Sequence, residues 1–445
     1  MNQNVSDLID EYSELEQENQ PEMVDSMLND NEPAEVALFI ESLPIEHRLA
    51  LWQNIPVEER LDILVAMRGD PRETIIDAMS LDDLDAIFKD INAENLVELA
   101  DSMPNKLVER AFNAMDVQQQ NYFEGAQSYD TKETGHWVDH NVLLLPPNAK
   151  VRDALRVLRR NTPDYSDLIY LVGRSGHLTG VIEVKEVFKA LEHSSIADLI
   201  NSEIEPLQGN EDAVKAAQRV QTSRLAGLPV ISDSNQFLGR LNIYTACEII
   251  NEDYESRLMA NAGLNEDEDL FAPILKSTKN RMIWLGINLL TAFLASWFIG
   301  IFEATLQQVV ALAILMPVVA SMGGIAGSQT LTLIIRGLAL GQITKANFKA
   351  LLKKEVSVGA LNGVLWAIVI GIIAKLWFGT YLIGVVIAAA IFINIAAAAL
   401  SGVLIPTLLD KLKIDPALSG SVILTTVTDI VGFVAFLGLG SLVLL

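Results

Sequence analysis

Long apolar stretches fill the C-terminal part of the chain and predict membrane helices. A helix needs about 20 apolar residues to cross the hydrocarbon core of a bilayer. Five stretches meet this length, at about 282–302, 306–340, 356–378, 381–409 and 417–445. The second is long for one crossing, so it should protrude or be broken. Only Phe378-Gly379-Thr380 separates the third from the fourth, which predicts a tight hairpin.

Basic residues orient these spans. Cytoplasmic loops of membrane proteins carry an excess of Lys and Arg. Ten basic residues fall on one side if the N-terminus is cytoplasmic: Lys276, Lys279, Arg281, Arg336, Lys345, Lys349, Lys353, Lys354, Lys411 and Lys413. The N-terminal sequence lacks the charged-then-apolar layout of a secretory signal. We therefore expect a multi-pass protein of the inner (plasma) membrane, embedded in lipid, with a cytoplasmic N-terminus and an external C-terminus.

Short amphipathic segments follow one another from about residue 33 to 124. Examples are ALFIESLP, EERLDILVAM and ENLVELADSMP, with Pro or Asp-rich starts between the segments. Units that each bury one face against a neighbour form a helical superhelix. An ordinary compact helical domain is the open alternative.

An internal repeat follows at an offset of 59 residues. Ala154 corresponds to Ala213, Val172 to Ile231, Leu178 to Phe237, Gly180 to Gly239 and Val184 to Ile243. Each copy has a helix, a β-branched run, a turn, a Gly-centred strand and another helix, which together form one α/β unit. The two copies look like a pair of cystathionine-β-synthase (CBS) domains. A duplicated fold without a ligand, serving as a dimer interface, stays open.

The predicted fold class is therefore multidomain. It combines an α-helical superhelix, an α/β tandem CBS pair and an all-α membrane domain of five helices. We place an acidic helical N-terminal domain at 1–127, the CBS-like pair at 128–250, a connecting helix at 251–278 and the membrane domain at 279–445. The helical pattern is clearest at about 245–264, and an acidic run, Glu266 to Asp269, separates it from the first span.

The distribution of charged residues also divides the chain near residue 276, just before the first predicted span. Of 32 basic and 57 acidic residues, eleven basic and five acidic residues lie at 276–445, so the preceding part carries −31 and this part +6. A charge of −31 argues against a nucleic-acid partner and suits a surface that attracts cations. No phosphate-binding loop, nucleophile elbow or acid/base pair is recognisable, so we expect no enzyme. The single cysteine, Cys247, excludes a Cys-rich metal site.

One acid lies deep in a predicted span. Asp429 is near the middle of the fifth stretch, with Thr425 and Thr426 on the same helical face. A charge at this depth is costly and marks a functional site by default. Oxygen ligands suit a hard cation such as Mg²⁺, which keeps several waters and needs one or two carboxylates. A carboxylate paired with Arg336, or hydrogen-bonded between helices, is the alternative.

Small residues cluster in the second span, in the segment Ser321 to Thr330. Its glycines, Gly324 and Gly327 among them, permit close helix packing. They also permit an unwound segment whose carbonyls line a water-filled path. Both interpretations stay open from the residues alone.

Along essentially its whole length the chain resembles the MgtE family of magnesium channels and transporters. NLLTAFLASWFIGIFE, MGGIAGSQTLTLIIRGLALG and DPALSGSVILTTVTDIVG resemble the first, second and fifth spans of that family. The resemblance implies a homodimer that passes Mg²⁺, with Co²⁺ as a further ion, and a connecting "plug" helix. Asp429 matches the family's ion-site aspartate. Asp82 and Asp83 match an acidic pair through which the family senses cytoplasmic Mg²⁺, so Mg²⁺ is implied as regulator and cargo.

Several positions depart from the family pattern. Ile325 replaces the signature asparagine of the second span, which puts strict Mg²⁺ selectivity in question. Tyr244-Thr245-Ala246-Cys247 replaces an acidic turn, Arg257 stands at an expected acid, and Tyr129-Asp130-Thr131-Lys132 replaces a Tyr-Pro-Glu-Asp stretch. We expect weakened sensing of cytoplasmic Mg²⁺. The alternatives are a Co²⁺ or other divalent-metal transporter of the same fold, and a membrane sensor that does not conduct.

Overall fold

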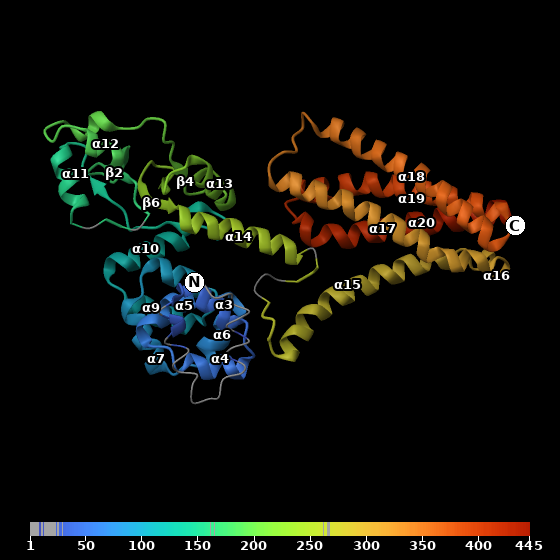
Figure 1. The fold of residues 1–445 in the computed structure, drawn as a ribbon, viewed down its shortest axis with the longest axis horizontal. Coiled ribbons are helices and arrows are strands. Elements are labelled where there is room, and N and C mark those ends of the chain that lie inside the picture. The colour runs from blue at the N-terminus through green and yellow to red at the C-terminus, as the bar shows by residue number, and fades with distance from the viewer. Residues whose placement is uncertain are drawn as a thin grey trace. The chain divides into compact units, whose positions relative to one another are not determined.

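The computed structural model describes residues 9, 12, 24, 26–28, 30–160, 162–163, 165–260, 262–264 and 268–445. These residues fall into two compact units (Figure 1). The first lies within Met1–Glu255 and Glu266–Pro273, and the second within Ser256–Asn265 and Ile274–Leu445. The first unit holds short helices and two small sheets. The second holds the long apolar helices.

Short helices of the first unit begin twelve residues apart. They are α3 (Pro33–Glu41), α4 (Ile45–Trp52), α5 (Val57–Ala66), α6 (Gly69–Ala78), α7 (Leu81–Ile87), α8 (Ala93–Ala100), α9 (Asn105–Ala114) and α10 (Val117–Gln127), with the 3₁₀ turn η1 (Phe88–Asp90) after α7. Helices two apart in sequence pack together, as α3 does on α5 and α4 on α6. This stacking agrees with the predicted helical superhelix.

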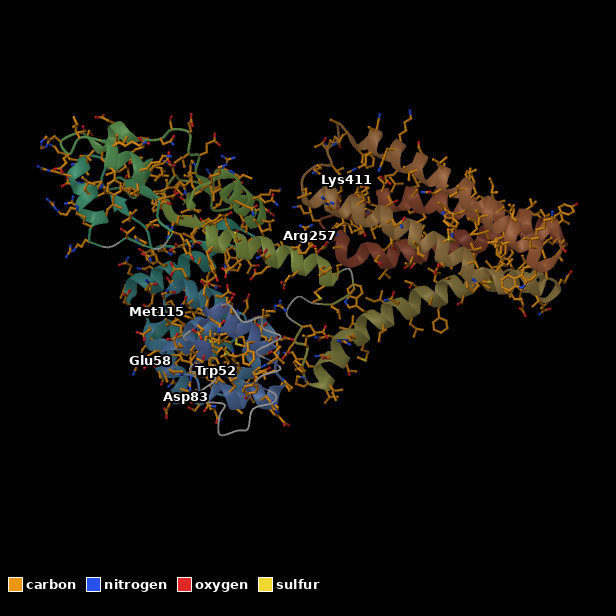
Figure 2. All side chains as sticks on the ribbon, in the orientation of Figure 1. Trp52, Glu58, Asp83, Met115, Arg257 and Lys411 are labelled. Carbon is orange, nitrogen blue, oxygen red and sulfur yellow. The ribbon has the colours of Figure 1, made fainter. Side chains whose placement is uncertain are left out.

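The spacing has a cause in the side chains. The seventh residue of each helix is buried: Phe39, Leu51, Ile63, Ile75, Ile87, Leu99, Ala111 and Phe123. In three successive helices the fourth residue is a buried arginine, and Figure 2 shows the side chains of this region. Arg48, Arg60 and Arg72 donate from Nε to the carbonyls of Ile40, Ile55 and Met67 at 2.9–3.2 Å. These bonds satisfy carbonyls at or after the end of the preceding helix.

Two three-stranded sheets follow, and each has the same topology. The first contains β1 (Leu144–Leu145), β2 (Leu168–Val172) and β3 (Leu178–Glu183), and the second β4 (Leu207–Gln208), β5 (Gly227–Ile231) and β6 (Phe237–Asn242). The first strand of each sheet runs parallel to the second, which pairs antiparallel with the third. The register of both hairpins shifts at equivalent places, Leu171/Val172 and Val230/Ile231. The predicted duplication at 59 residues is confirmed.

Helices flank these strands. They are α11 (Val151–Leu158), α12 (Val184–Lys189), α13 (Ala213–Ser223) and α14 (Ile243–Ala260), with 3₁₀ turns η2 (Thr134–Trp137) and η3 (Ile196–Leu199). The helix predicted near 245–264 is α14. The described residues after it, 262–264 and 268–273, are not helical. Glu266 and Asp267 of the predicted acidic run lie outside the described residues.

Five helices of the second unit are long and apolar enough to cross a membrane, as the sequence predicts. They are α15 (Ile274–Gly300), α17 (Val310–Ala339), α18 (Phe348–Phe378), α19 (Tyr381–Lys411) and α20 (Pro416–Leu444). The second apolar stretch is broken: a short helix, α16 (Glu303–Gln308), ends at Val309, whose φ and ψ are −126° and 79°. The predicted hairpin turns through Gly379, whose φ of +69° is in the left-handed region that glycine favours.

Within this unit α19 packs against α17, α18 and α20, so it lies at the centre of the helices (Figure 1). Close approach depends on small residues. A Cβ placed on Gly384 of α19 would lie 2.6 Å from the carbonyl of Gly371 on α18. A Cβ on Gly402 would lie 2.8 Å from Thr330 on α17. Outside this core, α15 packs mainly on α20.

Candidate functional site

Two contacts between α17 and α20 fix their register. Gly327 of α17 faces Leu424 of α20, since a Cβ on that glycine would lie 3.0 Å from the leucine side chain. Gly432 of α20 faces Val319 of α17, since a Cβ on that glycine would lie 3.1 Å from the valine side chain. The helices are therefore antiparallel. Asp429 lies between the two α20 contact positions and Gly324 between the two on α17, so the register puts Asp429 and Gly324 at similar depth.

The carboxylate of Asp429 is half-buried in this part of α20. Within the part of the chain that the structure describes, it makes no ion pair or hydrogen bond. The described residues therefore show neither an Asp429–Arg336 ion pair nor a hydrogen bond from Asp429 to another helix. A membrane carboxylate without a protein partner needs water or a bound cation to compensate its charge. This is the arrangement expected of a cation site.

Two hydroxyls precede Asp429 by about one helical turn. Thr425 donates to the carbonyl of Ser421 at 3.1 Å, and Thr426 donates to that of Val422 at 2.7 Å. These bonds use the hydroxyl protons and leave oxygen lone pairs free to accept. One carboxylate and two hydroxyl oxygens on one helical face can hold the water shell of a hard cation.

The glycine-rich segment is helical. Residues Ser321 to Thr330 lie inside α17, so of the two interpretations left open the unwound segment is wrong. Glycine permits unwinding but does not force it, and an apolar medium favours every backbone hydrogen bond that a continuous helix makes. The packing interpretation is confirmed at Gly327, which lies between Leu424 of α20 and Gly402 of α19. Gly324 differs, because a Cβ there would meet no atom within 4 Å.

Ile325, which replaces the signature asparagine of the family in the second span, is 57% exposed. It lines a cavity of about 490 Å³ between α17 and α18, to which α19 also contributes lining residues. Polar groups in this cavity come from Gln329, Asn362 and Glu355, and the last is 4% exposed and paired with Lys354. Neither Asp429 nor Gly324 lines it. The cavity is therefore separate from the Asp429 site.

Asp82 and Asp83, the acidic pair predicted to sense Mg²⁺, lie in the first turn of α7. Asp83 accepts a hydrogen bond from the hydroxyl of Ser80 at 2.6 Å and lies 3.6 Å from the guanidinium of Arg60. Among the described residues, no group of three or more His, Cys, Asp or Glu side chains could hold a metal ion. A sensing role for this pair stays a prediction.

Sequence reasoning missed a buried carboxylate on α14. Burial raises the pKa of Glu248 to about 7, against a partly opposing hydrogen bond from Tyr244, and the negative charge of Glu98 on α8 raises it further. Burial raises the pKa of Tyr244 to about 12, and the negative charge of Glu248 adds to this rise. Glu98 in turn pairs with Arg72 at 3.1 Å. Glu248 directly follows the Tyr244–Cys247 stretch, and only folding brings Glu98 to it.

We expect the packing of α14 on the N-terminal helices to weaken as pH rises from 6 to 8. A carboxyl whose folded pKa lies above its unfolded value stabilises most below the unfolded pKa, and this contribution is lost as pH rises through the folded pKa, here near 7. One group titrating in this window changes the unfolding free energy by about 1 kcal/mol. Hydrogen exchange of α14 at both pH values measures it. Glu248→Gln should remove the pH dependence; an unchanged dependence would contradict the assignment.

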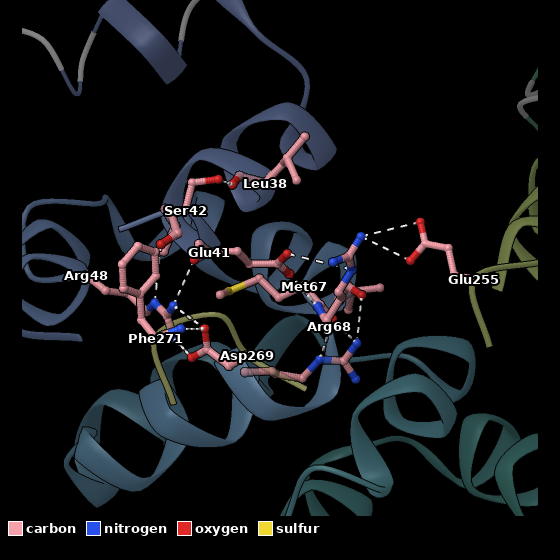
Figure 3. Close-up of polar contacts among 12 residues, drawn as sticks. Leu38, Glu41, Ser42, Arg48, Met67, Arg68, Glu255, Asp269 and Phe271 are labelled. Atoms are coloured by element: carbon pink, nitrogen blue, oxygen red, sulfur yellow. Dashed lines mark hydrogen bonds and ion pairs between the residues drawn. The ribbon is translucent and has the colours of Figure 1, made fainter. Parts of the chain in front are cut away.

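A second polar network holds the segment before α15 (Figure 3). The guanidinium of Arg48 is 0% exposed and makes two bonds to the carboxylate of Asp269, at 2.6 and 3.1 Å. The same guanidinium donates to the carbonyls of Ile40, Glu41 and Leu43 at 2.9–3.2 Å. The residues just before the first long helix are thereby fixed to the end of α3.

Comparison with known families accounts for most of this organisation. The model described as a divalent cation transporter, MgtE, matches residues 316–439. The MgtE intracellular N domain matches 31–132, and a CBS domain matches 135–193, the first of the two repeats. Together with the five long apolar helices, these matches indicate a multi-pass membrane transporter of divalent cations. The chain belongs to the MgtE family.

Curated relatives agree. The magnesium transporter MgtE of Bacillus subtilis is 23% identical over 354 residues, which cover 78% of each chain. That of Enterococcus faecalis is 27% identical over 317 residues, covering 71% of this chain and 70% of its own. Among solved structures, the cytosolic domain of the Mg²⁺ channel MgtE in complex with ATP matches 55% of this chain and 100% of its own, at 17% identity and a TM-score of 0.47. The CBS pair of a putative Mg²⁺ transporter from Shewanella oneidensis matches 38% and 98%, at 29% identity and a TM-score of 0.33.

Proposed function

We propose that the protein is a homodimeric, Mg²⁺-permeable channel or transporter of the inner membrane, with Asp429 at its ion site. The observation that carries the proposal is the half-buried carboxylate of Asp429, which has no protein partner among the described residues. Thr425 and Gly324 complete the candidate ion path; the side of Gly324 where a Cβ would meet no atom within 4 Å is its open side. Gly327 supports the path by packing against Leu424. The magnesium transporters among the relatives support Mg²⁺ as cargo. The dimer rests on the family resemblance.

The proposal includes the orientation predicted from the basic residues, with the N-terminus in the cytoplasm and the C-terminus outside. In this orientation the acidic first unit meets cytoplasmic Mg²⁺. The end of α14 supports a regulatory role, because Ala260 belongs to a buried cluster with Leu331 and Ile335 of α17 and with Ala417 and Leu424 of α20. Displacement of α14 would therefore disturb the two helices that frame the candidate ion path.

Reconstitution into liposomes tests the proposal. Purified protein should pass Mg²⁺ down its gradient, measured with an indicator trapped inside. Co²⁺ should be compared in the same vesicles, because Ile325 puts apolar surface where the family has a signature asparagine. Preference for Co²⁺ would favour the divalent-metal alternative. Failure to pass any divalent cation would favour the sensor that does not conduct and would overturn the proposal.

We expect the gate to close at a higher cytoplasmic Mg²⁺ concentration than in a typical relative. Mg²⁺ favours closure by neutralising facing carboxylates. Tyr244–Cys247 and Arg257 replace acids at positions where the family carries them. Patch-clamp recording across a series of Mg²⁺ concentrations measures the threshold, with the Bacillus subtilis relative as reference. Closure of both proteins at the same concentration would contradict this prediction. Restoring an acid by Arg257→Glu should lower the threshold.

A further inference from the structure

A buried asparagine lies where three membrane helices meet. Asn394 of α19 is 0% exposed. Its Nδ2 donates to the carbonyl of Val319 on α17 at 2.8 Å, and its Oδ1 is a buried oxygen with no hydrogen-bond partner in the structure. A buried polar group in a membrane is costly, and one left half-satisfied costs more. Packing alone would be served better by leucine.

Two glycines on two other helices make the space for this side chain. A Cβ on Gly323 of α17 would lie 2.2 Å from Nδ2 of Asn394, and a Cβ on Gly432 of α20 would lie 2.6 Å from the same atom. The amide is therefore held between α17 and α20. Gly432 lies one helical turn after Asp429, and Gly323 directly precedes Gly324. The amide thus fills the junction beside the candidate ion site.

We propose that Asn394 is a positioning residue of the ion path. Its amide sets the separation of α17 and α20 at the depth of Asp429, and so the distance between the Asp429 carboxylate and the open side of Gly324. The Nδ2 bond ties α19 to α17, while the two glycines let α20 close on the same group. This inference rests on the proposed function.

The test uses full-length protein in liposomes and two variants that displace the amide differently. Asn394→Leu keeps the branched shape with some added volume and removes the amide. Gly323→Ala keeps the amide and pushes a methyl group into it. Both should raise the Mg²⁺ concentration for half-maximal uptake about tenfold, the scale of one interhelical hydrogen bond. Controls are Asn288→Leu and Gly286→Ala on α15, because Asn288 is exposed and donates to Trp284 of its own helix, and a Cβ on Gly286 meets no atom within 4 Å. Both should leave uptake unchanged.

A second measurement does not depend on transport. Spin labels at exposed positions Ile314 of α17 and Val434 of α20, in a Cys247→Ser background, report the separation of the two helices. Both displacing variants should change this distance, and the controls should not. If wild-type protein passes no divalent cation, the proposed function fails while the distance still decides the role of Asn394. An unchanged distance, or an unchanged half-maximal concentration in a conducting protein, would overturn the inference.

Discussion

Asp429→Asn is expected to reduce divalent-cation uptake by about a hundredfold or more, to the background of empty liposomes. The amide has the same shape as the carboxylate, so the packing of α20 should be unchanged. It carries no charge, however, and the remaining hydroxyls of Thr425 and Thr426 are neutral. Nothing then offsets the cost of bringing a doubly charged, hydrated ion into the membrane.

The control for this prediction is Asp410→Asn. Asp410 is an exposed acid in the last turn of α19 and outside the candidate path, so its variant should transport like wild type. Asp429→Glu keeps the charge but lengthens the side chain, and should give intermediate uptake. Thermal unfolding in detergent should be similar for all three variants. Uptake by Asp429→Asn at the wild-type rate would remove Asp429 from the ion path.

Asp269→Ala is expected to lower the unfolding free energy of the first unit by about 3–5 kcal/mol, because it leaves the Arg48 charge buried without its partner. The side chains of Arg48 and Asp269 are 0% and 2% exposed, so water cannot replace the lost bonds without opening the fold. The backbone N–H of Phe271 also loses its acceptor, Oδ1 of Asp269 at 2.9 Å. Chemical denaturation of the full chain in detergent, followed by tryptophan fluorescence, measures the loss.

A nearby exposed ion pair is the matched control. Arg68 and Glu255 lie 3.0 Å apart, and their side chains are 44% and 46% exposed. Glu255→Gln should therefore cost less than about 1 kcal/mol. The double variant Arg48→Met, Asp269→Leu should recover only part of the loss, because it removes both charges together but leaves the carbonyls of Ile40, Glu41 and Leu43 without their donor. Equal effects of Asp269→Ala and Glu255→Gln would contradict the buried pair.

Features that repeat locally or depend on hydrophobic length were predictable. The five spans, the hairpin at Gly379 and the duplicated α/β unit follow from apolar runs, turn residues and a fixed offset. Asp429 is a candidate because it is the only charge in its span, and its place at the ion site stays a prediction. The start of α15 at Ile274, before the predicted 282, was missed because a helix extends beyond the apolar residues that cross the bilayer.

Features that depend on distant residues were not predictable. Arg48 and Asp269 are far apart in sequence, and the residues around each give no indication that the two side chains form an ion pair. Asn394 looks like one polar residue in a long apolar run, and only the packing of Gly323 and Gly432 gives it a role. The glycine-rich segment left packing and unwinding open, because small side chains are compatible with both, and only the structure decides between them.

The constant interval between the helices of the first unit has a consequence for changes in chain length. Each helix from α4 to α10 starts twelve residues after the one before it, and its seventh residue is buried as in α3. Inserting or deleting twelve residues adds or removes one complete helix and leaves the spacing and buried positions of every later helix unchanged. Inserting a single residue breaks the interval at one place and disturbs the packing between the helices before and after the insertion. Natural variation in the length of this helical region should therefore occur in steps of twelve residues.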